Sequence, residues 1–213
     1  MLFHARIEFD LTAFKGHFAL WKNGVRHRDV SPSNLMYKAE GNNVFGVLND
    51  FDLATVVDGV TGYDRTGTVP FMAIDLLTEE GLAGKIKHIY AHDAESFIWT
   101  LTWLCLRYED GKLRVYNRPL DQWLKVDALA CGKEKLYFLW HPPEGLTAGK
   151  GHEQNWLVAK ECLVALAKVL YGARYFPAES LSEASDQEVL EKLLQEPLRN
   201  QVLEAQGSGV AER

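Results

Sequence analysis

Apolar residues near the start of the chain recur at helical spacing. Leu11, Phe14, Phe18 and Trp21 are separated by three, four and three positions, so a single helix face can carry all of them. Gly24 follows, and glycine is the residue that most often ends a helix in a left-handed conformation. The pattern predicts an amphipathic helix that stops at Gly24, just before a polar loop.

Two short apolar runs then surround a turn. Residues 35–38 and 44–48 flank Glu40, Gly41, Asn42 and Asn43, a combination typical of a β-hairpin. Loops are expected on both sides of this hairpin, at 27–34 and 49–55. Residues 55–68 are polar, with interspersed glycines and threonines, and are predicted to lie at the surface.

The second half of the chain is predominantly helical in pattern. Residues 93–107 are apolar nearly all round and begin with an aspartate suited to an N-cap, which predicts a helix in the middle of the core. Helical periodicity returns at 127–139, 153–171 and 183–194, and the polar end, 206–213, is expected to be disordered. The predicted fold class is mainly α with a small β-hairpin, in one domain.

Composition excludes several classes of protein. With 47% apolar and 24% charged residues the chain has a globular composition, and its net charge of −6 argues against nucleic acid as a partner. Cys105, Cys131 and Cys162 lack metal-ligand spacing and suit a reducing compartment. No signal peptide is apparent, and the apolar run at 97–106 is shorter than the ~20 residues that span a bilayer. An intracellular protein, cytoplasmic or nuclear and without a membrane partner, is expected.

The most specific motif is HRDVSPSN at 27–34, which matches the catalytic-loop pattern of protein kinases. In that pattern the aspartate accepts or orients the proton of the substrate hydroxyl, and an asparagine five residues later ligates magnesium. These roles fall to Asp29 and Asn34. His27 is expected to be structural.

Two further motifs follow in the order that a kinase requires. NDFDLA places Asp50 after the second hairpin strand, where a kinase aspartate coordinates the magnesium that bridges the ATP phosphates. GTVPFMAIDLL at 67–77 occupies the place of the segment that ends the activation loop, and Asp75 stands at the glutamate of the APE motif.

Together these motifs make the sequence similar to the fungal-type protein kinase family. The resemblance rests on HRDVSPSN, DFDLA, GTVPFMAIDLL and HDAESFIWTLTW and covers roughly residues 10–175. It implies ATP and Mg²⁺ as cofactors and a protein as substrate. It also implies that Asp93 hydrogen-bonds the catalytic-loop backbone, that Arg28 steadies the activation segment, and that Thr68 faces Asp29.

The resemblance corresponds to the C-terminal lobe of a kinase. Residues 1–200 are predicted to form this lobe, with a DFG-like motif at 50–52 and an activation segment at 50–75, and residues 201–213 a flexible tail. The 26 residues before the HRD triplet contain neither a Gly-rich loop nor a VAIK-like lysine. The N-terminal lobe is therefore expected to be absent, independent activity is not expected, and a partner that supplies or covers the missing face is conceivable.

Several residues depart from the common kinase pattern. Ser31 replaces the lysine that contacts the γ-phosphate, and Asp52 replaces the glycine of DFG. Thr61, Tyr63 and Thr66 are candidate phosphorylation sites, although an ordinary solvated loop explains them equally well.

Three functions remain open from the sequence. The first is a kinase that transfers the ATP γ-phosphoryl group to protein Ser/Thr hydroxyls, the specificity resting on Thr68 and the GT spelling. The second is a non-catalytic, pseudokinase-like binding module that docks a partner on the face below the missing lobe. The third, a small-molecule phosphotransferase, is disfavoured by the GTVPFMA segment.

Overall fold

The computed structural model describes residues 8–41, 43–56, 67–116, 118–175, 185–197 and 199. Helices make up most of these ranges, and their strands form three two-stranded antiparallel sheets. The prediction of a mainly helical fold with a small β-hairpin is confirmed at this level. Thr61, Tyr63, Thr66 and the polar end of the chain lie outside the described ranges.

The first helix, α1 (Glu8–Lys22), begins before the predicted position at Leu11. Of the predicted face, Phe14 and Trp21 are buried and Phe18 is half-buried against the core, while His17, which the prediction did not include, is buried as well. Gly24 adopts a left-handed φ of 84°, as expected for a helix-terminating glycine. The helix thereby ends where the chain turns toward the HRD motif.

The predicted hairpin is present and longer than expected. Strands β2 (Leu35–Glu40) and β3 (Asn43–Leu48) are antiparallel, with Leu35 opposite Leu48. A second pairing, between β1 (Val25–Arg26) and β4 (Thr55–Val56), joins the two loops that flank the hairpin. Strands of two residues carry no readable alternation, so the sequence did not reveal this pairing.

Helix α3 (Tyr90–Arg107) occupies the core and is buried on nearly every side. The predicted start with Asp93 as N-cap is wrong, because Ile89 is the N-cap and Asp93 lies within the first turn. The Nδ1 atom of His92 accepts the N–H of Ile89 at 3.2 Å, so this ring satisfies an N-terminal donor. The additional first turn of α3 is as buried as the rest of the helix, so a change between apolar and polar positions does not mark where the helix begins.

The remaining long helices also follow the predicted ranges. They are α4 (Ala128–Trp140), with Asp127 as N-cap, and α5 (Glu153–Tyr175). The last helix was predicted from residue 183, but α6 (Asp186–Leu190) starts after a capping box of Ser185 and Glu188 and continues as the π-helix η5 (Glu191–Gln195).

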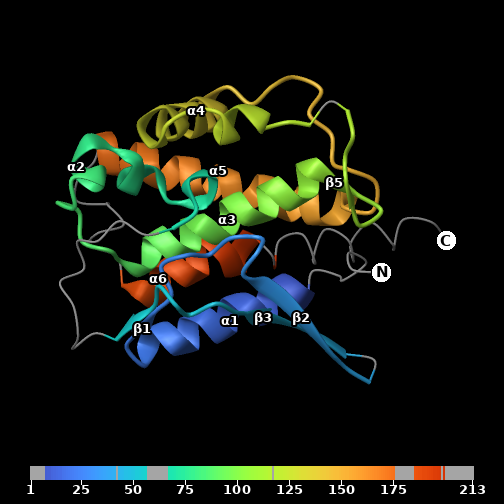
Figure 1. Ribbon diagram of the computed structural model, residues 1–213, viewed down its shortest axis with the longest axis horizontal. Coiled ribbons are helices and arrows are strands. Elements are labelled where there is room, and N and C mark those ends of the chain that lie inside the picture. The colour runs from blue at the N-terminus through green and yellow to red at the C-terminus, as the bar shows by residue number, and fades with distance from the viewer. Residues whose placement is uncertain are drawn as a thin grey trace.

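Short elements connect the long helices. They are η1 (Val69–Phe71), η2 (Ile74–Leu77), α2 (Glu79–Leu82), β5 (Tyr108–Glu109), β6 (Lys112–Leu113) and η3 (Asp121–Leu124). Figure 1 shows α3 in the middle of the molecule, with α4 and α5 on one side and α1, α6 and the β2–β3 hairpin on the other. The catalytic-loop motif lies between α1 and this hairpin.

The three cysteines are buried thiols, one on each of α3, α4 and α5, and none forms a disulfide. Among the described residues, no helix combines the length and apolarity needed to cross a membrane.

Candidate functional site

His27 anchors the loop from beneath. The ring is 1% exposed, and its Nε2 donates to the carbonyl of Asn49 at 2.9 Å while Nδ1 accepts the N–H of Asp29 at 3.3 Å. Phe51 packs edge-on against it, with ring centroids 4.8 Å apart. Burial lowers the pKa of His27, in accord with a neutral ring that uses one nitrogen as donor and the other as acceptor.

The carboxylate of Asp29 is held by one residue of its own loop, Asn34, and by one residue of the later segment at 67–77, Thr68. Oδ2 accepts from Nδ2 of Asn34 at 3.0 Å. Oδ1 accepts from the N–H of Thr68 at 2.8 Å and from its hydroxyl at 2.9 Å. Three donors thus fix the orientation of one partly exposed carboxylate.

Asn34 is oriented from several directions. Its Nδ2 also donates to the backbone carbonyl of Asp29 at 2.9 Å, which leaves Oδ1 as the acceptor end of the amide. Ser33 donates its hydroxyl to that Oδ1 at 3.3 Å, and Ser31 lies 2.8 Å from Ser33, oxygen to oxygen. Ser31, the residue in place of a lysine, is therefore part of a polar chain. Nothing in the sequence, apart from the two serines, indicated this series of side-chain hydrogen bonds.

Asp50 is brought beside this loop by backbone contacts of its neighbour. The N–H of Asn49 donates to the carbonyl of Asn34 at 2.8 Å, while the carbonyl of Asn49 accepts from His27. Asp50 has a left-handed φ of 61°, is exposed, and forms no ion pair with any residue in the described ranges. Its carboxylate is thus available to a ligand at the mouth of the site.

The oxygen donors of this region suit a magnesium ion. No cluster of three or more His, Cys, Asp or Glu side chains is present among the described residues. Mg²⁺ does not require one, because it commonly takes one or two protein oxygens and completes its shell with water and phosphate oxygens. The carboxylate of Asp50 and Oδ1 of Asn34 are donors of that kind.

Unusual backbone angles collect around the site. Arg28 has a φ of 71°, like Asp50 on the opposite loop. Gly67 has a φ of 131°, and a Cβ there would meet Met72 at 3.1 Å and the carbonyl of Arg28 at 3.2 Å. Such conformations are costly and persist where surrounding structure enforces them. They place Thr68 directly against Asp29.

Asp75 lies in η2, and its side chain is exposed. Its carbonyl accepts the hydroxyl of Thr78 at 2.7 Å, and within the described residues its carboxylate forms no ion pair. Partial burial raises the pKa of this carboxyl. The contact that Asp75 contributes to this segment is therefore made by its backbone carbonyl and not by its side chain.

Two residues that the sequence analysis did not select hold this segment instead. Oε1 of Glu95 accepts the N–H of Ile74 at 2.8 Å and the indole N–H of Trp99 at 2.8 Å. Lys135 donates its ammonium to the carbonyl of Met72. A carboxylate and an ammonium from α3 and α4 thus clamp both sides of Ala73. The sequence feature that could have identified these two residues is a charged residue inside an apolar helical run, Glu95 in α3 and Lys135 in α4.

Both members of this clamp are buried. Burial raises the pKa of Glu95, and attraction to Lys135 opposes that effect. Burial also lowers the pKa of Lys135 to about 8, against the attraction of Glu95. The ammonium lies over the ring of Trp99, 4.6 Å from its centroid, which partly replaces the lost hydration.

Asp93 has a different set of partners from the one that the resemblance implies. His17 and His88 place their Nε2 atoms 2.9 and 2.7 Å from its two oxygens. Burial would raise the pKa of Asp93, but the charge and hydrogen bonds of His88 and His17 hold it far below its ordinary value. Side chains of α1 and of the residues before α3, rather than loop backbone, donate to this carboxylate. Asp93 therefore links the first turn of α3 to α1 and to His88.

Comparison with known proteins agrees with the motif order. Residues 11–105 match the family model described as "Fungal protein kinase". The chain is 26% identical over 149 residues to the calcium/calmodulin-dependent protein kinase type II alpha chain of Drosophila melanogaster, covering 66% of this chain and 28% of that one. It is 25% identical over 147 residues to a serine/threonine-protein kinase H1 homolog of Danio rerio, covering 64% and 34%. The chain thus spans about a third of the length of these relatives.

Proposed function

We propose that this chain, whose residues 11–105 match the fungal protein kinase model, provides the catalytic lobe for transfer of the γ-phosphoryl group of Mg·ATP to a protein hydroxyl. Asp29 is the base that orients the attacking hydroxyl, and Asn34 and Asp50 hold the magnesium ion. Serine or threonine is the preferred acceptor, in line with the kinds of kinase to which the chain is similar. Residues 1–200 carry the lobe that does this.

The fixed carboxylate of Asp29 is the observation that carries the proposal. Asn34 and Thr68 occupy both of its oxygens, at 2.8 to 3.0 Å, so the group is oriented before any substrate arrives. Preorganisation of this kind lowers the barrier, because no reorientation is needed during the reaction.

The metal would add charge neutralisation at the phosphate oxygens. Asn34 suits its role because Nδ2 is committed to Asp29, while Oδ1, which accepts one long hydrogen bond from Ser33, keeps a second lone pair for a cation. Asp50 suits its role because its carboxylate is exposed and its neighbour Asn49 is hydrogen-bonded to the backbone of Asn34. The loop itself supplies no cation, since Ser31 stands where a lysine is usual, so we expect slower transfer than in kinases that keep the lysine.

A second function, that of a non-catalytic docking module, is favoured by a different observation. Apolar side chains beside the catalytic loop are exposed, including Met36 (52%), Val47 (41%) and Val56 (62%). Met36 and Val47 are directly opposite each other on the hairpin, so they form one apolar surface. Such a surface suits either an upper lobe or a partner protein that covers this face.

The direct test is transfer of labelled phosphate from Mg·ATP to a generic protein substrate by the 213-residue chain. Asp29→Asn is expected to abolish transfer and leave nucleotide binding intact. Asp50→Asn is expected to abolish transfer and the magnesium dependence of nucleotide binding. Glu144→Gln, a change of an exposed carboxylate away from the site, is the matched control and should retain full activity.

The two functions predict different results for the unmodified chain. Transfer that depends on Asp29 and Asp50 supports the kinase. Absence of both transfer and Mg·ATP binding contradicts a catalytic role for this chain. In that case Met36→Asp and Val47→Asp test the docking module, because both should prevent self-association or partner capture on the exposed hairpin face, as measured by sedimentation.

A further inference from the structure

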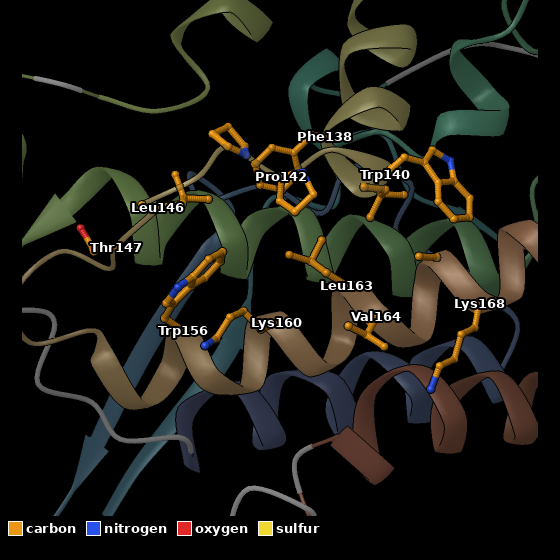
Figure 2. Close-up of a pocket in the computed structure, with 14 residues that line it drawn as sticks. Phe138, Trp140, Pro142, Leu146, Thr147, Trp156, Lys160, Leu163, Val164 and Lys168 are labelled. Carbon is orange, nitrogen blue, oxygen red and sulfur yellow. The ribbon is translucent and has the colours of Figure 1, made fainter.

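An apolar groove lies on the side of the molecule away from the catalytic loop. Its volume is about 610 Å³, and it is bounded by the end of α4, the loop at 142–147 and the outer face of α5. Figure 2 shows Phe138, Trp140 and Pro142 facing Trp156 and Leu163 across this hollow. The size is typical of ligand and anchor-residue pockets in proteins. Nothing in the proposed phosphoryl transfer uses this groove.

One wall of the groove is a row of four side chains on α5. Trp156, Lys160, Val164 and Lys168 are spaced by four residues, so each lies beside the next in a row that turns by about 40° around the helix at each step. With a rise of ~1.5 Å per residue, the two lysines are ~12 Å apart along the axis. Figure 2 shows both lysines extending from α5 along the edge of the hollow, with Val164 between them.

The two lysines are uncompensated within the described part of the chain, where neither forms an ion pair. On the far side of the row a smaller hollow of about 290 Å³ shares Val164 and Lys168 with the groove. Glu161, Lys192 and Glu196 line that hollow, so its charges are mixed. The groove itself is apolar with cations as its charged lining. Its complement is therefore an apolar surface with anionic groups along one edge.

The spacing of the lysines distinguishes an extended partner from a small one. A single carboxylate or phosphate head group is small compared with the ~12 Å that separates the backbone positions of the two lysines along the helix. A helix lying along α5, with acidic residues eight positions apart beside its apolar face, matches both at once. The continuation of the surface into the second hollow also extends it beyond the length of a compact ligand.

We propose that this groove is a docking site for an amphipathic helix of a partner protein, with its apolar face on Trp156 and Leu163 and its acidic residues on Lys160 and Lys168. Helix recognition of this kind uses apolar anchors at helical spacing and flanking charges for orientation. The inference does not depend on the chain's being an active kinase.

A designed peptide pair tests the proposal. The probe is an 18-residue lactam-bridged helix with leucine and phenylalanine on one face and two glutamates eight positions apart beside it. The matched peptide carries lysines at those two positions. Fluorescence anisotropy is expected to give at least tenfold tighter binding of the glutamate peptide, with a difference that shrinks as salt is raised. Equal affinity, or no binding of either peptide, overturns the proposal.

Variants of the protein make the test specific to this groove. Lys160→Glu with Lys168→Glu is expected to reverse the preference in favour of the lysine peptide, and Val164→Asp to weaken both peptides. Lys133→Glu, at an exposed position of α4 outside the groove, is the control and should leave the preference unchanged. Circular dichroism of each variant separates lost binding from lost folding. A control that shifts the preference as much as the double variant contradicts the assignment.

Two other occupants give distinct results. If sodium myristate binds and the glutamate peptide does not, the groove is a small-molecule site and the proposal is wrong. If the chain sediments as a dimer that Val164→Asp dissociates, a second copy of the chain covers the groove, and the proposal of a separate helical partner is likewise overturned.

Discussion

The carboxylate of Asp29 accepts three hydrogen bonds in the candidate site. Two of its three hydrogen bonds come from Thr68, which belongs to a segment far along the chain. Thr68 follows Gly67, whose φ of 131° would strain any other residue and where a Cβ would lie only 3.1 Å from Met72 and 3.2 Å from the carbonyl of Arg28. A single backbone conformation therefore determines how the proposed base is presented.

Substitution of Thr68 tests this arrangement. Thr68→Val removes the hydroxyl donor and keeps the backbone N–H, so phosphoryl transfer should fall about tenfold or more, the value of one hydrogen bond to a charged group, ~1.5–3 kcal/mol. Thr68→Ser retains the hydroxyl and should restore most of the rate. Initial rates with labelled ATP measure both variants. Equal losses in the valine and serine variants would mean that the methyl group, and not the hydroxyl, matters.

His27 gives the loop a dependence on pH. Its pKa is lowered by burial in the folded state, so below pH ~6.5 the unfolded chain takes up a proton that the folded chain resists. The free energy of unfolding should therefore fall as the pH decreases below ~6.5, by up to ~1.4 kcal/mol per pH unit from His27 alone.

Urea unfolding of the unmodified chain and of His27→Gln between pH 5 and 7.5 measures this effect. The variant lacks the titrating group, and its stability should vary less with pH. Identical pH profiles for both proteins would assign the dependence to other residues.

The motifs predict roles for single residues but not their distant hydrogen-bond partners. Asp29, Asn34 and Asp50 were selected because their spacing is tied to a motif, and the structure brings Asp29 and Asn34 into hydrogen-bond contact. The partners of Asp93 were not found, since His17 lies 76 residues away and no local pattern connects the two. A contact of that length depends on how α1 packs on α3, which residue types alone do not specify.

At the level of elements, the segment at 72–74 is held by helices on two sides. Glu95 of α3 and Lys135 of α4 bind its backbone from the interior, while Asp75 faces solvent. Charged residues in a core are costly unless they are paired and hydrogen-bonded. Their retention here is explained by the backbone groups of Met72 and Ile74 that they satisfy.

A double-mutant cycle measures the coupling of this pair. Lys135→Met and Glu95→Gln should each destabilise the protein by about 3–5 kcal/mol, because each leaves the other member buried without its partner. The double variant should lose clearly less than the sum of the two. Urea unfolding at pH 7 gives all three values. Additive losses would show that the two charges act independently.

The same elements mark the limit of prediction from periodicity. The long helices and the hairpin were predicted because each has an apolar face with a clear period. The extra first turn of α3 was missed because Tyr90, Ala91 and His92 are all buried, so no alternation marks the boundary. β1 and β4 were missed because each is only two residues long.

At the scale of the whole molecule, α3 connects parts of the chain that are remote in sequence. α1 lies on one side of it, α5 on another, and α6 with η5 completes its cover (Figure 1). Trp21 of α1 donates its indole N–H to Asp186 at the start of α6 at 2.8 Å. The core that packs beside the loop at 27–34 therefore includes the last helix, α6.

Truncation of a single side chain in that last helix should weaken the entire fold. Leu193 is 0% exposed, and Leu193→Ala is expected to reduce the free energy of unfolding by about 2–5 kcal/mol. Tryptophan fluorescence and far-ultraviolet circular dichroism should show the same lowered midpoint if α6 and the hairpin unfold together. Val164→Ala, at a half-exposed position of α5, is the control and should cost much less. Separate midpoints for the two signals would contradict a single cooperative core.

The buried cysteines make the motions of this core measurable without any introduced label. Cys105, Cys131 and Cys162 lie on three different helices, and each is 0% exposed, so a thiol reagent reaches them only during openings of the helices that cover them. If the helices open as one unit, the three thiols react at a common rate. If α4 detaches alone, Cys131 reacts first. Each of α3, α4 and α5 thus carries a native thiol whose reaction rate reports how often that helix opens.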